Sequence, residues 1–141
     1  MQAGQADHTR HDVLPWAQNL YAESVDNKDA AGFAAAFTSD AWLQFANAPR
    51  IVGRDAIEAA IAQFFASFRD LRHESKGTWL QGDTLILEAV VTYTRHDGQR
   101  VSVPAVTILR LASGAASNSP LADQCRIYVD LTPLYAVAGP A

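Results

Sequence analysis

The last predicted strand carries the side chains best suited to acid–base chemistry. Over residues 124–132, Asp130 shares one face with Arg126 and Tyr128, and an apolar row occupies the other face. The period alone leaves open which row faces the interior. If the polar row does, its apolar surroundings raise the pKa of the Asp130 carboxyl and suit it to general acid–base catalysis. The alternative is a structural aspartate bonded to Tyr128, to His73 or to a backbone amide.

A histidine at the start of the first long predicted strand is the second candidate. His73 lies in the strand predicted over residues 72–80, and strict alternation places it on the same face as Trp79. An imidazole that faces Asp130 would form an acid–base pair near neutral pH. The alternative is a histidine at the rim of the fold without a partner.

Other polar and aromatic side chains are candidates for ligand contacts. Tyr21 lies on the apolar face of the first predicted helix, and its hydroxyl, like that of Tyr128, can donate to a ligand oxygen or bond within the core. Asn47 can hold a water or a ligand, or bond its own backbone before a turn. Most large aromatic residues belong to the core. Those lining a remaining cavity would favour a flat apolar ligand, and the candidates are Phe45, Trp42 and Trp79.

Helices followed by a meander of strands must position these groups. Apolar periodicity predicts helices over residues 13–27, 29–37 and 53–69. Alternation predicts strands over residues 41–46, 72–80, 84–96, 100–111 and 124–132. Gly82 and Gly98 lie in the predicted hairpin turns, where a positive φ is expected. The pattern indicates an α+β fold with the helices on one face of the sheet.

Composition limits the classes of partner. The 141 residues are 49% apolar and 18% charged, with a net charge of -4. We expect one domain over residues 12–136, between tails at 1–11 and 137–141. No basic stripe and no apolar run of about 20 residues is present, which argues against nucleic-acid and membrane partners. The polar N-terminus and the single Cys125 indicate a cytoplasmic protein without an internal disulfide.

Metal and cofactor chemistry have little support in the sequence. The four histidines are scattered, and no pair has the spacing of metal ligands. No glycine-rich phosphate loop is present. We therefore expect neither a metal nor a cofactor.

Four segments, in their order and spacing, resemble the nuclear-transport-factor-2-like superfamily in its SnoaL-like branch. The segments are YAESVDNKD at 21–29, residues 40–55 ending in IVGRD, DTLILEAVVTYTR at 83–95 and RIYVDLTPLY at 126–135. The resemblance implies a cone-shaped, curved antiparallel sheet wrapped around three N-terminal helices, with an open end that admits a small molecule. Members include isomerases, dehydratases, cyclases, epoxide hydrolases and proteins without known catalysis, so the fold does not settle the function.

The ketosteroid isomerase branch is matched at one functional position of three. The resemblance places the oxyanion-hole tyrosine of that branch on Tyr21. Its catalytic base falls on Phe45, and its second acid falls on Val106. Because an apolar side chain cannot transfer a proton, this chemistry is incomplete.

The limonene-epoxide hydrolase branch is matched at two functional positions but not at the centre of its charged relay. The resemblance places the water-binding asparagine on Asn47 and one carboxylate on Asp130. The arginine that bridges the two carboxylates falls on Ala89, and the other carboxylate falls on Val91. The acid that opens the epoxide is therefore missing.

Together these residues predict a small-molecule enzyme for an apolar, oxygenated substrate, acting by isomerisation, dehydration, cyclisation or hydrolysis. Asp130 would be the acid/base and His73 would assist it. Tyr21, Tyr128 and Asn47 would position the substrate or a water, and an apolar wall would surround it: Phe45, Trp42, Val91, Val106 and Trp79. The alternative is a non-catalytic binding module for a small apolar ligand. A third possibility is a dimerisation domain with a vestigial pocket.

A homodimer is the expected assembly. The outer sheet face is predicted around Thr107 and Arg110, with an apolar set beside them: Val90, Val103, Ala105, Leu109, Ile127 and Val129. Such a face favours sheet-to-sheet pairing, as is frequent in the superfamily. The alternative is a solvated face with scattered apolar residues.

Overall fold

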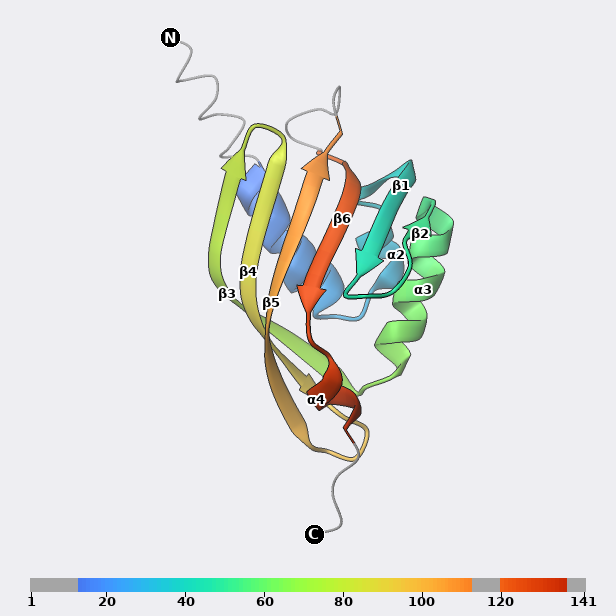
Figure 1. The fold of residues 1–141 in the computed structure, drawn as a ribbon, viewed down its shortest axis with the longest axis vertical. Coiled ribbons are helices and arrows are strands. Elements are labelled where there is room, and N and C mark those ends of the chain that lie inside the picture. Colours follow the sequence, from blue (N-terminus) through green and yellow to red (C-terminus); the bar gives the residue numbers. More distant parts are fainter. Residues whose placement is uncertain (1–12, 113–119, 137–141) are drawn as a thin grey trace.

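The computed structural model describes residues 13–112 and 120–136. A curved sheet of six strands carries the helices on its inner face (Figure 1). The predicted tails at 1–11 and 137–141 lie outside the described residues. The α+β class and the open, cone-like sheet are confirmed.

The N-terminal half supplies the helices and the short side of the sheet. Residues 13–19 are α-helical and continue into a π-helix, η1 (Leu20–Val25). Then follow α2 (Ala30–Ala34), β1 (Phe37–Phe45), β2 (Ile51–Val52) and α3 (Arg54–Ala66). Ile57, Ile61 and Phe65 recur every four residues along α3 and are buried, as the apolar stripe predicts.

The C-terminal half is the predicted meander. It consists of β3 (Asp70–Gln81), β4 (Thr84–Thr94), β5 (Arg100–Leu111) and β6 (Ala122–Val129), followed by a short helix, α4 (Thr132–Tyr135). Gly82 and Gly98 have φ values of 61° and 87°, which confirms the predicted turns. The last strand ends at Val129, earlier than predicted, because Leu131 is already the N-cap of α4.

The sheet is mixed rather than purely antiparallel. Its strand order is β2-β1-β6-β5-β4-β3, and β1 runs parallel to β6 while every other neighbouring pair is antiparallel. Successive hairpins dictate the antiparallel pairs, whereas α3 and the whole meander separate β1 from β6 along the chain. The direction of β1 was therefore outside what local patterns could predict.

The second helix is shorter than predicted. It ends at Ala34, and Phe37, which was expected inside it, begins β1. The backbone N–H of Ala122 donates to the carbonyl of Ala36, so pairing with β6 takes over there. The rings of Phe33 and Phe37 still pack edge to face, 5.1 Å apart.

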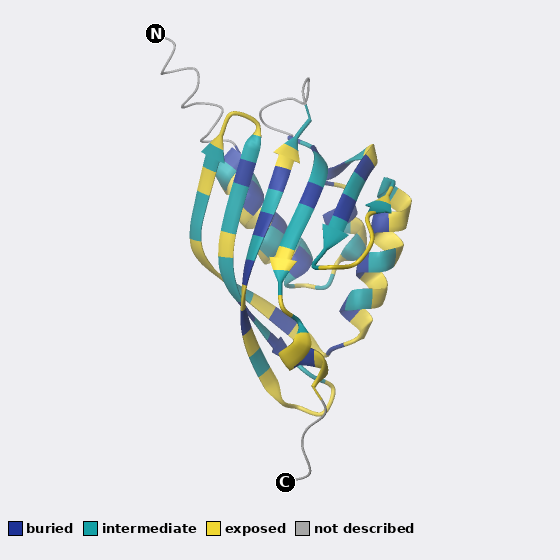
Figure 2. Cartoon of the chain, viewed as in Figure 1, coloured by how far each residue is buried: buried dark blue, intermediate teal, exposed yellow. Residues whose placement is uncertain are grey.

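The alternating burial of the strands shows which row faces the helices (Figure 2). In β6, Cys125 is fully buried and Ile127 lies against the core, while Tyr128 is 53% exposed. The apolar row is therefore the inner one. Burying it removes more hydrocarbon from water than burying the row of Arg126 and Tyr128 would.

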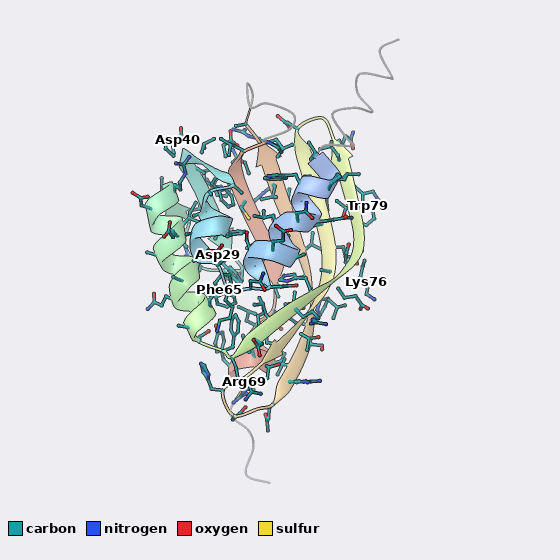
Figure 3. All side chains as sticks on the ribbon, turned by 180° about the vertical axis from the view of Figure 1, so that it is seen from behind. Asp29, Asp40, Phe65, Arg69, Lys76 and Trp79 are labelled. Atoms are coloured by element: carbon teal, nitrogen blue, oxygen red, sulfur yellow. The ribbon has the colours of Figure 1, made fainter. Side chains whose placement is uncertain are left out.

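A β-bulge in β3 reverses the facing of half that strand. Ser75 pairs with Ala89 and Gly77 pairs with Glu88, so Lys76 is an extra residue. Trp79 consequently lies on the outer face, not on the face of His73 as strict alternation predicted. An added Cβ at Gly77 would clash with the indole of Trp79, so this ring lies over the glycine at the sheet edge (Figure 3).

No helix in residues 13–112 and 120–136 is long and apolar enough to cross a membrane.

Candidate functional site

The helices and the curved sheet enclose a hollow of about 150 Å³. Apolar side chains form most of its wall and come from the first helix, α3 and all the long strands. Figure 3 shows the sheet from the helix side, with Phe65 in the interior between α3 and the strands. Polar residues also line it, Gln18, Ser75, Thr78 and Glu88 among them. Three others form one connected group: Tyr21, Asp26 and His73.

Asp26 and His73 form a doubly bonded pair on this wall. One carboxylate oxygen of Asp26 lies 2.7 Å from Nδ1 of His73, and the other accepts the backbone N–H of His73 at 3.1 Å. The two side chains are 20% and 16% exposed. An ionised carboxylate can only accept, so Nδ1 carries a proton, and in the neutral imidazole Nε2 then presents a lone pair. The described residues give Nε2 no hydrogen bond, so it is free to act as a base.

The π-helical turn brings Asp26 to His73. The N–H of Asp26 donates to the carbonyl of Tyr21, five residues earlier, at 2.8 Å. In a regular α-helix, residues five apart are separated by about 140° around the axis. The wider turn narrows that angle, and both residues contact His73: the Tyr21 ring lies 4.7 Å from the imidazole, centre to centre.

A second hydroxyl extends this group across the hollow. The phenol of Tyr21 donates to Oγ1 of Thr107 at 3.1 Å. Thr107 is the single buried polar residue among those described, and its own proton remains available to an oxygen in the hollow. Burial raises the pKa of the Tyr21 phenol, so it stays protonated and remains a donor at all ordinary pH values.

Four of the predicted site residues line the hollow: His73, Tyr21, Phe45 and Val91. Phe45 closes one end, where its ring packs against Phe64 with centres 4.8 Å apart. Val91 is paired with His73 across β3 and β4. All four residues therefore contribute to the lining of the same hollow.

Asp130 lies outside the hollow, contrary to the expectation. The chain leaves β6 at Val129, and the Asp130 carboxylate turns back to accept the N–H of Thr132 at 3.0 Å on the exposed surface. The bonds from Thr132 lower the pKa of Asp130, whereas burial in an apolar pocket would have raised it. The structural alternative, an aspartate bonded to a backbone amide, is confirmed.

The other predicted contacts also lie elsewhere. Asn47 is exposed in the turn after β1. The remaining four belong to the outer sheet face, because each lies on the outer row of its strand: Trp42, Trp79, Val106 and Tyr128. Trp42 instead carries the guanidinium of Arg50, 3.9 Å from its ring centre.

The predicted outer face of the sheet also needs correction. Thr107 was assigned to it but points inward to Tyr21. The apolar residues named with it, apart from Val90, face the interior: Val103, Ala105, Leu109, Ile127 and Val129. The outer row of β5 and β6 consists of the residues between them, such as Val106 and Tyr128. In both strands the inward and outward residues are therefore exchanged relative to the prediction.

Asp26 and Thr107 are the residues that sequence reasoning missed. Asp26 lies five residues after Tyr21, which in an α-helix would put it on another face. No sequence signal announces a π-turn. Thr107 could have been found, because it alternates with Ala105 and Leu109 and therefore belongs to an apolar row.

No three His, Cys, Asp or Glu side chains in the described ranges lie close enough together to hold a metal ion.

The sequence matches the SnoaL-like domain over residues 17–117. The chain therefore belongs to the SnoaL-like family. It gives no match among curated proteins.

Solved structures with the same fold come from diverse bacteria. An NTF2-like protein of unknown function from Burkholderia pseudomallei K96243 superposes with a TM-score of 0.74 at 15% identity, over 87% of this chain and 94% of that one. A putative SnoaL-like polyketide cyclase from Jannaschia sp. CCS1 gives 0.70 at 22%, over 94% and 93%. An LEH-like epoxide hydrolase from M. tuberculosis gives 0.64 at 15%, over 82% and 80%. At these identities the similarity establishes the fold alone.

Proposed function

We propose that this protein is a cofactor-independent enzyme that removes a proton from a carbon next to a carbonyl group in a small, largely apolar substrate. The observation that carries the proposal is the Asp26–His73 pair on the wall of an apolar hollow. Isomerisation, dehydration and cyclisation all begin with such a proton transfer.

His73 would be the general base. Its Nδ1 is held by Asp26, so Nε2 would take the substrate proton and the imidazolium would be stabilised by the carboxylate 2.7 Å away. This arrangement replaces the Asp130 base predicted from the sequence.

Thr107 and Tyr21 would stabilise the developing enolate. Tyr21 donates to Thr107, which leaves the threonine proton free for a substrate oxygen. A hydrogen bond to an oxyanion in an apolar surround is worth more than one in water. The lining residues include no Arg or Lys, so the electrostatic contribution rests on neutral donors.

Epoxide hydrolysis has less support in this hollow. The two-carboxylate relay of the epoxide hydrolase branch would need Asp130, an arginine and a second acid. Asp130 accepts from Thr132 on the surface, and Val91 lies at one of the other positions. An apolar side chain thus stands where that branch places one of its relay groups.

Hydrogen–deuterium exchange tests the proposal without a known product. Small cyclic ketones and enones are incubated with the protein in D₂O, and deuterium at the α-carbon is followed by NMR. The wild type should exchange, and His73→Asn should lose roughly 10²–10⁴-fold of the rate. His96→Asn is the matched control, since His96 lies in an exposed turn and bonds the carbonyl of Ala66.

The outcome also decides between catalysis and the alternative, a binding module. The apolar wall, including Phe45 and Val91, would hold a ligand with or without turnover. Equal exchange by the wild type and His73→Asn would end the enzymatic proposal. Ligand-induced chemical shifts without exchange would then favour a binding module.

A further inference from the structure

A second hollow adjoins the aromatic end of the first. It has a volume of about 330 Å³ and lies between β1, β2, α3 and the segment that leads into α4. The two hollows share Phe45, Ile61 and Phe64 in their walls. Only this partition of side chains therefore separates them.

The wall of the second hollow is hydrocarbon. Leu43, Ile51, Ala60 and Leu131 contribute to it, and no charged side chain does. Among its lining residues, the hydroxyl of Tyr135 is the single polar side-chain group. A polar ligand group placed here would lose its hydrogen bonds to water without replacement, whereas an alkyl group would not.

The partition admits a narrow group. The rings of Phe45 and Phe64 are tilted by 52° with centres 4.8 Å apart, and both side chains are only partly buried. The two rings are in contact, so the hollows join only when the Phe64 side chain moves. An unbranched chain needs a smaller displacement of this ring than a fused ring system does.

The first hollow is smaller than most ligand pockets. A cavity of about 150 Å³ holds one benzene-sized ring, and ligand pockets generally measure about 300–1,000 Å³. A substrate larger than a single ring must therefore extend either through the mouth of the hollow or past the partition, and the apolar wall beyond the partition favours the second route for a hydrocarbon group.

We propose that the two hollows form one elongated site, which takes a ligand with a single oxygenated ring at His73 and an unbranched hydrocarbon tail that passes between Phe45 and Phe64. The inference rests on the proposed function for the position of the ring. The tail would lie against α3 and end under Leu131 and Tyr135. The second hollow would thus select the length of the substrate tail, and the first would hold the ring that reacts at His73.

Binding of a homologous series tests the inference. The probes are phenol and its 4-alkyl derivatives from methyl to octyl, and the dissociation constants are measured by calorimetry. Kd should fall about fourfold for each methylene that enters the second hollow. Phenol itself should bind weakly, because it reaches only the first hollow.

A matched pair of variants on α3 locates the tail. Ala60→Phe fills the second hollow, so long-chain probes should lose their advantage while phenol binds as before. Ala59→Phe makes the same change at the exposed neighbouring position, which lines neither hollow, and should behave as the wild type. If Ala60→Phe does not fold, Ala48→Phe fills the same hollow from the loop after β1.

The results separate this inference from the proposed function. A wild type that binds phenol without any dependence on chain length would overturn the elongated site alone. The same would follow if both Ala60→Phe and Ala48→Phe kept the full dependence. Chain-length dependence without deuterium exchange supports the elongated site and counts against the catalytic proposal. Failure of every probe, phenol included, would overturn the elongated site, and deuterium exchange of the cyclic ketones would still decide the catalytic proposal.

Discussion

The Asp26 carboxylate holds His73 at two points, the ring Nδ1 at 2.7 Å and the backbone N–H at 3.1 Å. One helix end and one strand are thereby joined at a single residue. The ring cannot turn its Nδ1 into the hollow without breaking the shorter bond. The orientation of the proposed base is thus a property of the helix–sheet contact and not of β3 alone.

Replacing this carboxylate should impair catalysis more than folding. In Asp26→Asn the amide no longer stabilises an imidazolium, so the exchange rate should fall by roughly 10²-fold. The Nδ1 proton of His73, followed by NMR, should lose its downfield shift. Asp29→Asn is the control, since Asp29 caps α2 and bonds Gly32 on the surface. Full activity in Asp26→Asn would mean that His73 works without an orienting partner.

Shortening the π-turn should leave Asp26 beside Tyr21 and His73. Deletion of Glu23, an exposed residue of η1, would place Asp26 four residues after Tyr21, about 40° around the axis of a regular α-helix and on the same face. We expect a folded protein, by circular dichroism, that keeps its exchange activity and its His73 Nδ1 resonance. Glu23→Ala keeps the length of the turn and is the control for the loss of the side chain. A folded but inactive deletion variant would show that the wide turn is required.

Asp130 should be dispensable for catalysis. Asp130→Ala should keep the exchange rate of the wild type, because this carboxylate bonds Thr132 on the surface. Its pKa is lowered in the folded protein, so its contribution to stability is present above the ordinary carboxyl pKa and is lost as the pH falls through the lower folded value. Thermal unfolding should therefore show a deficit for Asp130→Ala at pH 7 that vanishes in acid. Loss of activity at pH 7 in a folded variant would return Asp130 to the site.

The hydrogen bond between Tyr21 and Thr107 should be measurable as a coupling. Tyr21→Phe, Thr107→Val and the double variant form a cycle. The expected interaction is about 1 kcal/mol in the free energy of unfolding, typical of a hydrogen bond between neutral groups. Denaturant unfolding supplies the values. Additive effects of the two substitutions would show that the bond adds nothing to stability.

The corrected outer sheet face remains a candidate for self-association. We propose that it pairs with a second copy of the chain through its apolar outer row: Trp79, Ile86, Val90, Val106, Ile108 and Tyr128. Glu88 and Arg126 on the same face supply opposite charges, which suits a two-fold interface. Val106→Lys should shift the protein to a monomer in sedimentation velocity. Ser102→Lys, near the start of β5, should leave the association unchanged. A monomeric wild type at high concentration would contradict the pairing.

Local patterns were enough to predict most of the elements. The meander from β3 to β6 followed from two-residue periodicity and from the glycine turns at Gly82 and Gly98, both of which depend on neighbours in the chain. The apolar stripe of α3 followed from four-residue spacing for the same reason. Tyr21 and His73 were found as site candidates because side-chain chemistry is visible in the sequence.

Register and facing came from the tertiary structure. The extra residue at Lys76 turned Trp79 outward, and the burial of Cys125 and Ile127 left Asp130 at the surface. In each strand either of two rows of side chains could face the helices, and only the packing against the helices decides which row does. The parallel pairing of β1 with β6 is a long-range choice of the same kind.

The sequence by itself determined the fold class, the apolar interior and two of the polar residues on its wall, since these follow from composition and local period. The tertiary structure decided the partners of those residues. A helical turn of five residues rather than four carried Asp26 to His73, and the inner row of β5 carried Thr107 to Tyr21. Hydrogen bonds depend on positions to within a fraction of an ångström, and such positions arise only when separate segments pack together.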